Sequence, residues 1–126
     1  MIVAGFGFRA SVSAQSLRDV YDKVAGNQRV SALATVTDKA RLCAFKTFAQ
    51  DMALPILVIP PHDLAAAETA TQSSASRDAW GTGSVAEASA LAAAGLGARL
   101  LKRRLISADR LATCALAQSA SGREDQ

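Results

Sequence analysis

Residues 80–88 set a glycine-rich turn directly before the start of a helix, and they read Trp80-Gly81-Thr82-Gly83-Ser84-Val85-Ala86-Glu87-Ala88. Ser84 is a favoured N-cap residue, and Glu87 follows it at the three-residue spacing of a capping box. The first N–H groups of a helix have no partner within the helix, and the helix dipole is positive at that end, so a helix start attracts anions. We therefore expect a negatively charged ligand near Ser84.

Apolar runs that precede this stretch predict three buried strands, at Met1–Ala4, Val30–Val36 and Pro55–Ile59. The third run is apolar throughout, which is typical of a strand buried on both faces. The connections between the runs are long enough to be helices, so the order is β-α-β-α-β. Such units form parallel strands with right-handed connections.

Helical periodicity predicts the connecting segments. Apolar residues recur at helical spacing over Ser13–Ala25, and Gly26-Asn27 ends that helix. A second helix is expected to start at Thr37-Asp38 and to bury one face, made of Leu42, Phe45, Ala49 and Met52. Pro61 is well placed in the first turn of a short helix that runs to about Ala67.

The second half of the chain predicts a helix and a hairpin. The helix runs from Ser84 to about Ala94, and strands at about 98–103 and 111–118 pair across Ser107-Ala108-Asp109. The expected fold is a three-layer α/β/α sandwich on a mixed, mostly parallel five-stranded sheet. Residues 1–118 are expected to form a single domain, and the polar tail at 119–126 is expected to be disordered. The polar segment 68–79 is interpreted as a mobile loop that folds over a ligand.

A second glycine pair lies in Gly5-Phe6-Gly7-Phe8-Arg9, and we expect it to be a turn that closes the first strand. Ligands of open α/β sheets bind beyond the carboxyl ends of the parallel strands, where both glycine turns and the segment after the second strand meet. The candidate substrate-binding residues are Gly5, Gly7, Arg9, Ser11, Thr35, Asp38, Lys39, Gly81, Thr82, Gly83, Ser84 and Glu87.

The cations near this edge differ in their expected roles. Arginine can bind a carboxylate with two parallel hydrogen bonds, and lysine acts as a point charge. We expect Arg9 and Lys39 to contact an anionic ligand, whereas Lys102, Arg103 and Arg104 are interpreted as a solvated strand end.

Several chemistries are not indicated. The dinucleotide pattern G-x-G-x-x-G fails at Ala10, and no acidic residue closes the second strand. His62, the only histidine, has no partner at metal-ligand spacing, and no serine lies in a nucleophile elbow. We therefore expect no metal and no cofactor. Glu87 is interpreted as a capping residue rather than a general acid or base.

Composition limits the class of protein. The 126 residues fit one domain, and half of them (50%) are hydrophobic, enough for a core. The net charge of +3 suits an anionic partner but is well below that of a nucleic-acid binder. The sequence contains no transmembrane run and no signal peptide, so we expect a cytoplasmic protein without membrane contact. Cys43 and Cys114 are expected to be buried free thiols.

Taken together, the two glycine segments and several later motifs resemble the CobE family, the stand-alone form of the C-terminal domain of CbiG. The similarity runs from about Val3 to Ala117. It includes Ala34-Thr35 before Asp38-Lys39-Ala40, Leu54-Pro55, and Ser107-Ala108-Asp109-Arg110-Leu111-Ala112-Thr113-Cys114-Ala115-Leu116-Ala117. The family often has Cys where this chain has Phe8 and Gly where it has Ser11, so a thiol role at position 8 is excluded.

The resemblance implies a role in cobalamin (vitamin B12) biosynthesis, in its oxygen-dependent branch. Precorrins and hydrogenobyrinic acid are rings fringed with carboxylates, and such a corrinoid is the expected ligand of a carrier or accessory factor. Other enzymes of the pathway are the expected protein partners. Two alternatives stay open: an enzyme that hydrolyses a lactone or ring substituent of a precorrin, assisted by Lys39, Glu87 or Asp38, and a nucleotide-binding α/β module.

Overall fold

The computed structural model describes residues 1–65, 84–95 and 97–120. The loop expected at 68–79 and the residues 121–126 of the expected tail lie outside these ranges. Ser119, the first residue of that tail, donates its backbone N–H to the Met1 carbonyl at 2.9 Å. The Met1 amino group donates to the Ser119 hydroxyl at 3.1 Å, and this hydrogen bond connects the first residue of the chain to the start of the tail.

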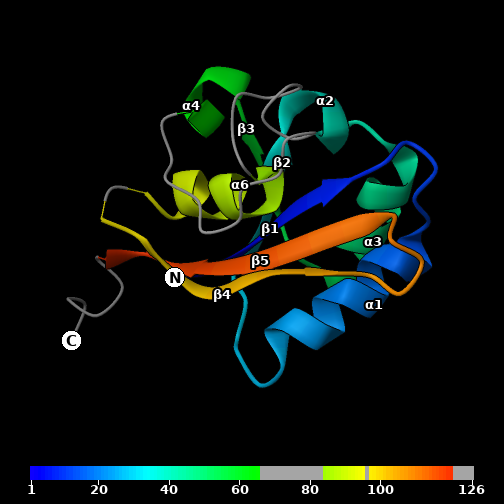
Figure 1. Cartoon of the computed structure of the whole chain (residues 1–126), viewed down its shortest axis with the longest axis horizontal. Helices are drawn as coiled ribbons and strands as arrows, with labels where there is room; N and C mark the ends of the chain where they lie inside the picture. The colour runs from blue at the N-terminus through cyan, green and yellow to red at the C-terminus, as the bar shows by residue number, and fades with distance from the viewer. Residues whose placement is uncertain (66–83, 96, 121–126) are drawn as a thin grey trace.

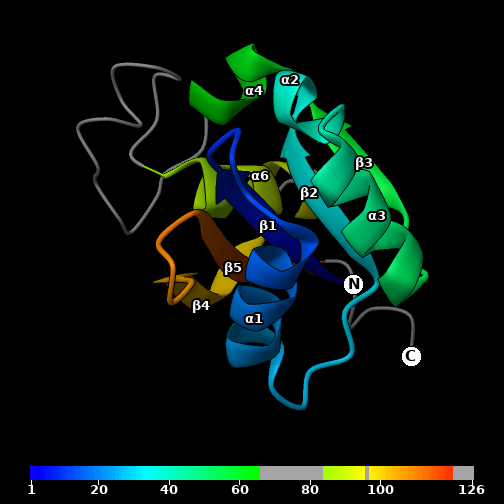
Figure 2. The same cartoon turned by 90° about the vertical axis from the view of Figure 1, so that its right-hand side faces the viewer.

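A five-stranded sheet forms the centre of the domain (Figure 1). The strands are β1 (Ile2–Phe8), β2 (Ala32–Val36), β3 (Ile56–Ile59), β4 (Arg99–Ile106) and β5 (Ala112–Gln118). Their spatial order is β3-β2-β1-β5-β4, which the strand labels follow across Figure 2.

The sheet is mixed, as expected, but it is not mostly parallel. The pairs β1–β2 and β2–β3 are parallel, and the pairs β1–β5 and β5–β4 are antiparallel. The sequence prediction was wrong in this respect because the hairpin joins the sheet beside β1 and contributes two antiparallel pairs. Since β5 is antiparallel to both of its neighbours, β4 runs in the same direction as β1.

The helices are α1 (Ala14–Ala25), α2 (Thr37–Ala40), α3 (Cys43–Met52), α4 (Pro61–Ala65) and α6 (Val85–Ala94). Buried residues of α1 and α3 join one core cluster, and those of α4 and α6 join another. In Figure 1, α4 and α6 lie toward the top and α1 and α3 toward the bottom. The start of α1 after its Ser13 cap, the Gly26 cap at its end and Pro61 in the first position of α4 are confirmed.

The side chains of β1 alternate between these two clusters, as those of a strand must. Ala4, Phe6 and Phe8 belong to the cluster of α1 and α3, whereas Val3 belongs to that of α4 and α6. Phe6 is fully buried, and its ring centroid lies 5.5 Å from that of Phe45 and 5.4 Å from that of Phe48. Burial of one such side chain contributes about 2–3 kcal/mol, so these rings anchor α3 to the sheet.

The helix expected from Thr37 onward is divided into two. Leu42 adopts extended backbone angles (φ −67°, ψ 131°) between α2 and α3. The predicted buried face is otherwise confirmed: Phe45 and Ala49 are buried, and Leu42 and Met52 pack against the same cluster. The division turns α3 onto the aromatic cluster, and neither glycine nor proline marks it in the sequence.

Two predictions about burial were wrong. The strand β3 is at the edge of the sheet rather than buried on both faces, and 49% of Val58 is exposed. Both cysteines are free thiols, but only Cys114 is buried, because Cys43 begins α3 on the exposed side. Burial raises the pKa of the Cys114 thiol well above its ordinary value.

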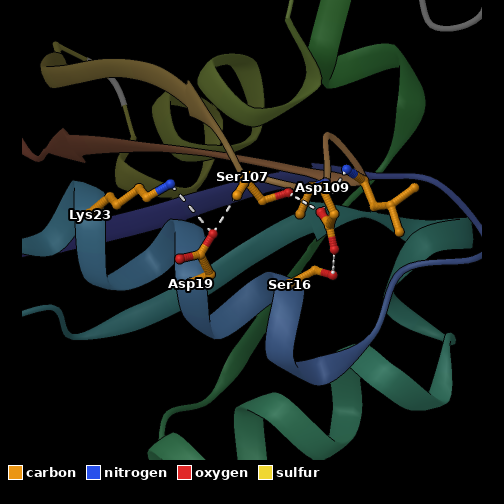
Figure 3. Close-up of polar contacts among 8 residues, drawn as sticks. Ser16, Asp19, Lys23, Ser107 and Asp109 are labelled. Carbon is orange, nitrogen blue, oxygen red and sulfur yellow. Dashed lines mark hydrogen bonds and ion pairs between the residues drawn. The ribbon is translucent and has the colours of Figure 1, made fainter.

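Polar contacts connect α1 to the β4–β5 turn (Figure 3). The Asp109 carboxylate accepts hydrogen bonds from the Ser16 hydroxyl, from the Ser107 hydroxyl at 2.6 Å and from the Leu111 N–H at 3.0 Å. Asp19 of α1 accepts the Ala108 N–H at 3.2 Å. One carboxylate therefore both shapes the turn and holds it against the first turn of α1.

Candidate functional site

The glycine pair Gly5 and Gly7 lies within a strand, not in a turn. Both Gly5 and Gly7 belong to β1, which continues to Phe8 and pairs with β5 along its whole length. A Cβ at Gly5 would lie 2.1 Å from the Ala86 carbonyl oxygen and 2.5 Å from the Ala90 nitrogen. The predicted turn was therefore wrong: Gly5 allows α6 to pack against the backbone of β1.

The start of α6 lies at the same end of β1 as the strand's carboxyl terminus. A Cβ at Gly7 would lie 3.4 Å from the Val85 Cβ, so the first helical residue is beside Gly7. The predicted N-cap is confirmed, because the Ser84 hydroxyl accepts the Glu87 N–H at 3.2 Å. The packing thus brings a helix N-terminus to the edge where the sequence predicts a ligand.

Lys39 of α2 extends to this edge from the other side of β1. Its ammonium donates a hydrogen bond to the Phe8 carbonyl, the last residue of β1, and lies 5.2 Å from the centre of the Phe8 ring. Partial burial lowers the pKa of the Lys39 ammonium below its ordinary 10.5. The short helix α2 therefore places a partly desolvated cation at the carboxyl end of the central strand.

The remaining described candidates divide into buried and exposed groups. Thr35 is fully buried in β2 and donates its hydroxyl hydrogen to the Phe6 carbonyl at 2.8 Å, so it connects two strands. Arg9 and Ser11 are exposed in the segment after β1, where the Arg9 N–H donates to the Leu111 carbonyl at 2.9 Å. Asp38 lies in α2. Gly81, Thr82 and Gly83 lie outside the described residues.

The burial of the Glu87 side chain and its contact with β4 were not indicated by the sequence. Its side chain is fully buried, and its carboxylate accepts the backbone N–H of Arg104 at 2.9 Å. A buried carboxylate is costly without hydrogen bonds, so this contact fixes α6 to β4. The contact with Arg104 was missed, because the sequence predicted the hairpin of β4 and β5 but not its position beside β1, where β4 reaches the start of α6.

A hollow of about 320 Å³ lies away from this edge, at the start of β3 and the end of α3. It is lined by Lys46, Ala49, Gln50, Ala53, Leu54 and Ile56. Parallel β2 and β3 begin at this end of the sheet, so the hollow is opposite the carboxyl ends where Lys39 lies. This hollow is an alternative ligand site against which the predicted site can be tested.

Two findings on the described residues concern metal binding and membrane spans. Within residues 1–65, 84–95 and 97–120, no three His, Cys, Asp or Glu side chains lie together as a metal site requires. No helix in this part of the chain is long and apolar enough to span a membrane.

A family model described as "Cobalamin synthesis G C-terminus" matches residues 2–117. The chain belongs to this family, that of the CbiG C-terminal domain. It is therefore a cobalamin biosynthesis protein of the CobE/CbiG family, as the resemblance implied. A comparison with curated proteins finds no match.

Solved structures of cobalamin biosynthesis proteins are similar to this CbiG C-terminal domain. CobE, described as a protein from the cobalamin (vitamin B12) biosynthetic pathway, has a TM-score of 0.83 and 30% identity over 93% of this chain and 89% of its own. The protein chiG from Agrobacterium tumefaciens str. C58 has a TM-score of 0.73 and 32% identity over 95% and 99% of the two chains.

A third structure shares the fold alone. It is a putative cobalamin biosynthesis protein G homolog from Sulfolobus solfataricus, with a TM-score of 0.69 and 23% identity. The match covers 92% of this chain but 36% of that longer protein. The CbiG C-terminal fold thus also occurs as part of a larger chain.

Proposed function

We propose that this domain binds a polycarboxylate corrinoid, a precorrin or a hydrogenobyrinic acid-type intermediate of the oxygen-dependent pathway, as a carrier or accessory factor. Membership of the cobalamin biosynthesis family supports the ligand class. The observation that supports the location is the Lys39 ammonium at the Phe8 carbonyl, at the carboxyl end of β1.

The chemistry of this edge suits a carboxylate. Lys39 is partly desolvated, and attraction between opposite charges is stronger where water is partly excluded. The guanidinium of Arg9 is the second cation of the proposed site, since Arg9 directly follows Phe8 on the exposed segment. A ring fringed with carboxylates would place one of them at Lys39 and another at Arg9.

The carrier role is favoured over catalysis by the surroundings of Glu87. A general acid or base must reach the proton that it transfers. The carboxylate of Glu87 is fully buried and accepts a backbone N–H, so it acts on the position of β4 rather than on a ligand. A carrier would release its ligand to other enzymes of the pathway, which are the proposed protein partners.

An absorbance titration of the purified protein with hydrogenobyrinic acid and available precorrins tests this function. We expect a saturable spectral shift that weakens in Arg9→Ala and in Lys39→Ala. The matched control is Arg29→Ala, which removes an exposed cation before β2, at the opposite end of the sheet. Absence of a shift with every intermediate would overturn the proposal, and product formation during the titration would favour the enzyme.

A further inference from the structure

The strand β4 concentrates positive charge on one edge of the sheet. Its eight residues include Arg99, Lys102, Arg103 and Arg104 and no acidic residue. Lys102 and Arg103 are exposed, and β4 is the last strand beside β5. Leu105 and Ile106, which follow the cations, are 42% and 38% exposed. The edge therefore combines adjacent cations with an exposed apolar end.

The backbone of β4 that carries these cations pairs irregularly with β5, and a hydrogen bond to α6 fixes its shape. The pairing of β4 with β5 shifts register between Leu100 and Lys102 and again between Lys102 and Leu105. Arg104 lies within the second irregularity, and its N–H donates to the buried Glu87 carboxylate. A bulge leaves an N–H unpaired in the ladder, so Glu87 satisfies the donor that the irregular pairing exposes.

Sheet register relates this edge to the site at β1. Lys102 is paired with Leu116, and Leu116 is paired with Ala4, so Lys102 is level with the middle of β1. The Lys39 ammonium lies at Phe8, the last residue of β1, and β1 is two strands from β4. At about 4.8 Å between neighbouring strands and about 3.4 Å per residue along β1 from Ala4 to Phe8, the two cationic regions are roughly 17 Å apart. One small carboxylic acid cannot contact both regions, whereas a large ring with carboxylates along its rim can.

We propose that Lys102, Arg103 and Arg104 form a second carboxylate-binding surface for the same ligand, with Glu87 as the positioning residue that fixes the strand. The inference rests on the proposed function and narrows the ligand class to acids with several well-separated carboxylates. Two contacts to one ligand raise affinity beyond that of either contact alone.

A charged edge strand also discourages pairing with another sheet, and that effect alone would explain exposed cations. It does not explain the exposed Leu105 and Ile106, which favour association rather than prevent it. Binding of an amphipathic acid accounts for both the exposed cations and the exposed apolar residues.

Titrations with hydrogenobyrinic acid of the wild type, the double variant Lys102→Gln/Arg103→Gln and the single variant Arg104→Gln test the surface. Arg104→Gln keeps the backbone N–H that Glu87 accepts, so the strand keeps its shape. We expect the double variant and the single variant each to bind hydrogenobyrinic acid about fivefold more weakly than the wild type. A loss of this size corresponds to the free energy that partly exposed charge pairs contribute. The control Arg29→Gln removes one charge at the opposite end of the sheet, and the fully methyl-esterified ligand removes the carboxylates.

The outcomes separate this surface from the function on which it rests. If the wild type binds and Lys39→Ala weakens binding while the β4 variants do not, the second surface is wrong and the proposed function stands. An equal loss in Arg29→Gln would show a net-charge effect and would also overturn the surface. The surface is likewise wrong if the ester binds as tightly as the acid, or if a single-stranded oligonucleotide binds more tightly and loses its binding in the β4 variants. No binding by the wild type overturns both proposals.

Discussion

The Gly5 Cα faces the Ala86 carbonyl so closely that a Cβ on Gly5 would lie 2.1 Å from that oxygen. Close approach of two backbones is one of the purposes that only glycine serves. The helix α6 is buried along most of its length, from Val85 to Ala90 and again at Ala94. This contact therefore determines how near the start of α6 lies to the end of β1.

Gly5→Ala should lower the free energy of unfolding by about 3 kcal/mol, because the methyl group overlaps backbone atoms that cannot move separately. Gly7→Ala is the graded comparison. Its closest contact is the Thr113 side chain at 2.9 Å, so we expect a smaller loss of about 1 kcal/mol. Denaturant unfolding monitored by circular dichroism measures both values. Wild-type stability in Gly5→Ala would contradict the packing of α6.

Ser89→Ala should raise the free energy of unfolding by about 1 kcal/mol. Among the described residues, the Ser89 hydroxyl is buried without a hydrogen-bond partner, and its removal relieves that cost. Alanine also has the higher helix propensity. The matched control on the same helix is Ser84→Ala, which removes the N-cap and should lower stability by about 1 kcal/mol. A loss of stability in Ser89→Ala would show that its hydroxyl is bonded in solution.

Asp109→Ala should lower the thermal midpoint at pH 7, because the turn between β4 and β5 loses its contact with α1. Hydrogen bonds from Ser107, Ser16 and the Leu111 N–H hold the pKa of Asp109 below its ordinary 3.8. A lowered carboxyl pKa stabilises the folded state above that ordinary value, and the contribution disappears as the pH falls below 3.8 through the folded-state pKa. The midpoints of the variant and the wild type should therefore converge in that acidic range.

Thermal unfolding at several pH values checks this convergence. Asp22→Ala is the control, since Asp22 makes an exposed ion pair with Arg18 at 3.5 Å and such pairs contribute little. If Asp22→Ala loses as much stability as Asp109→Ala at pH 7, the network at Asp109 has no special structural role.

The limits of sequence reasoning are visible at particular residues. Helix starts at Ser13 and Ser84 were predicted correctly because a cap is a local feature of a few residues. The glycines of β1 were misread as a turn, because glycine serves tight turns and close packing alike. Val58 was expected to be buried, yet β3 is an edge strand. Strand order depends on contacts between distant segments, so local hydrophobicity could not reveal it.

The candidate site was predictable to a similar degree. Lys39 was identified from its place after the second strand, and the structure brings its ammonium to the Phe8 carbonyl. Glu87 was interpreted through its three-residue spacing from Ser84, which gave the cap and missed the contact with Arg104. That contact requires the β4–β5 hairpin to join the sheet beside β1, next to α6, and this long-range relationship is absent from the local pattern.

Ligand affinity should fall as the pH rises through the lowered pKa of Lys39, because the neutral amine no longer attracts a carboxylate. Lys39→Arg should keep its affinity to higher pH, since a guanidinium stays protonated. Protein stability should change in the opposite direction: between the lowered pKa and 10.5 the unfolded chain binds more protons, so the free energy of unfolding rises with pH. Titrations between pH 7 and pH 10.5 measure the affinity. Parallel pH profiles for wild type and Lys39→Arg would contradict a contact at Lys39.

The most direct test of the central claim is a map of backbone amide chemical shifts during titration with hydrogenobyrinic acid. We predict saturable shifts at the carboxyl ends of β1 and β2 and in the first turn of α6, at residues such as Arg9, Lys39 and Ala86. Absence of any shift, or shifts confined to the hollow lined by Ala49, Ala53 and Ile56, would contradict a corrinoid site at this edge of the sheet.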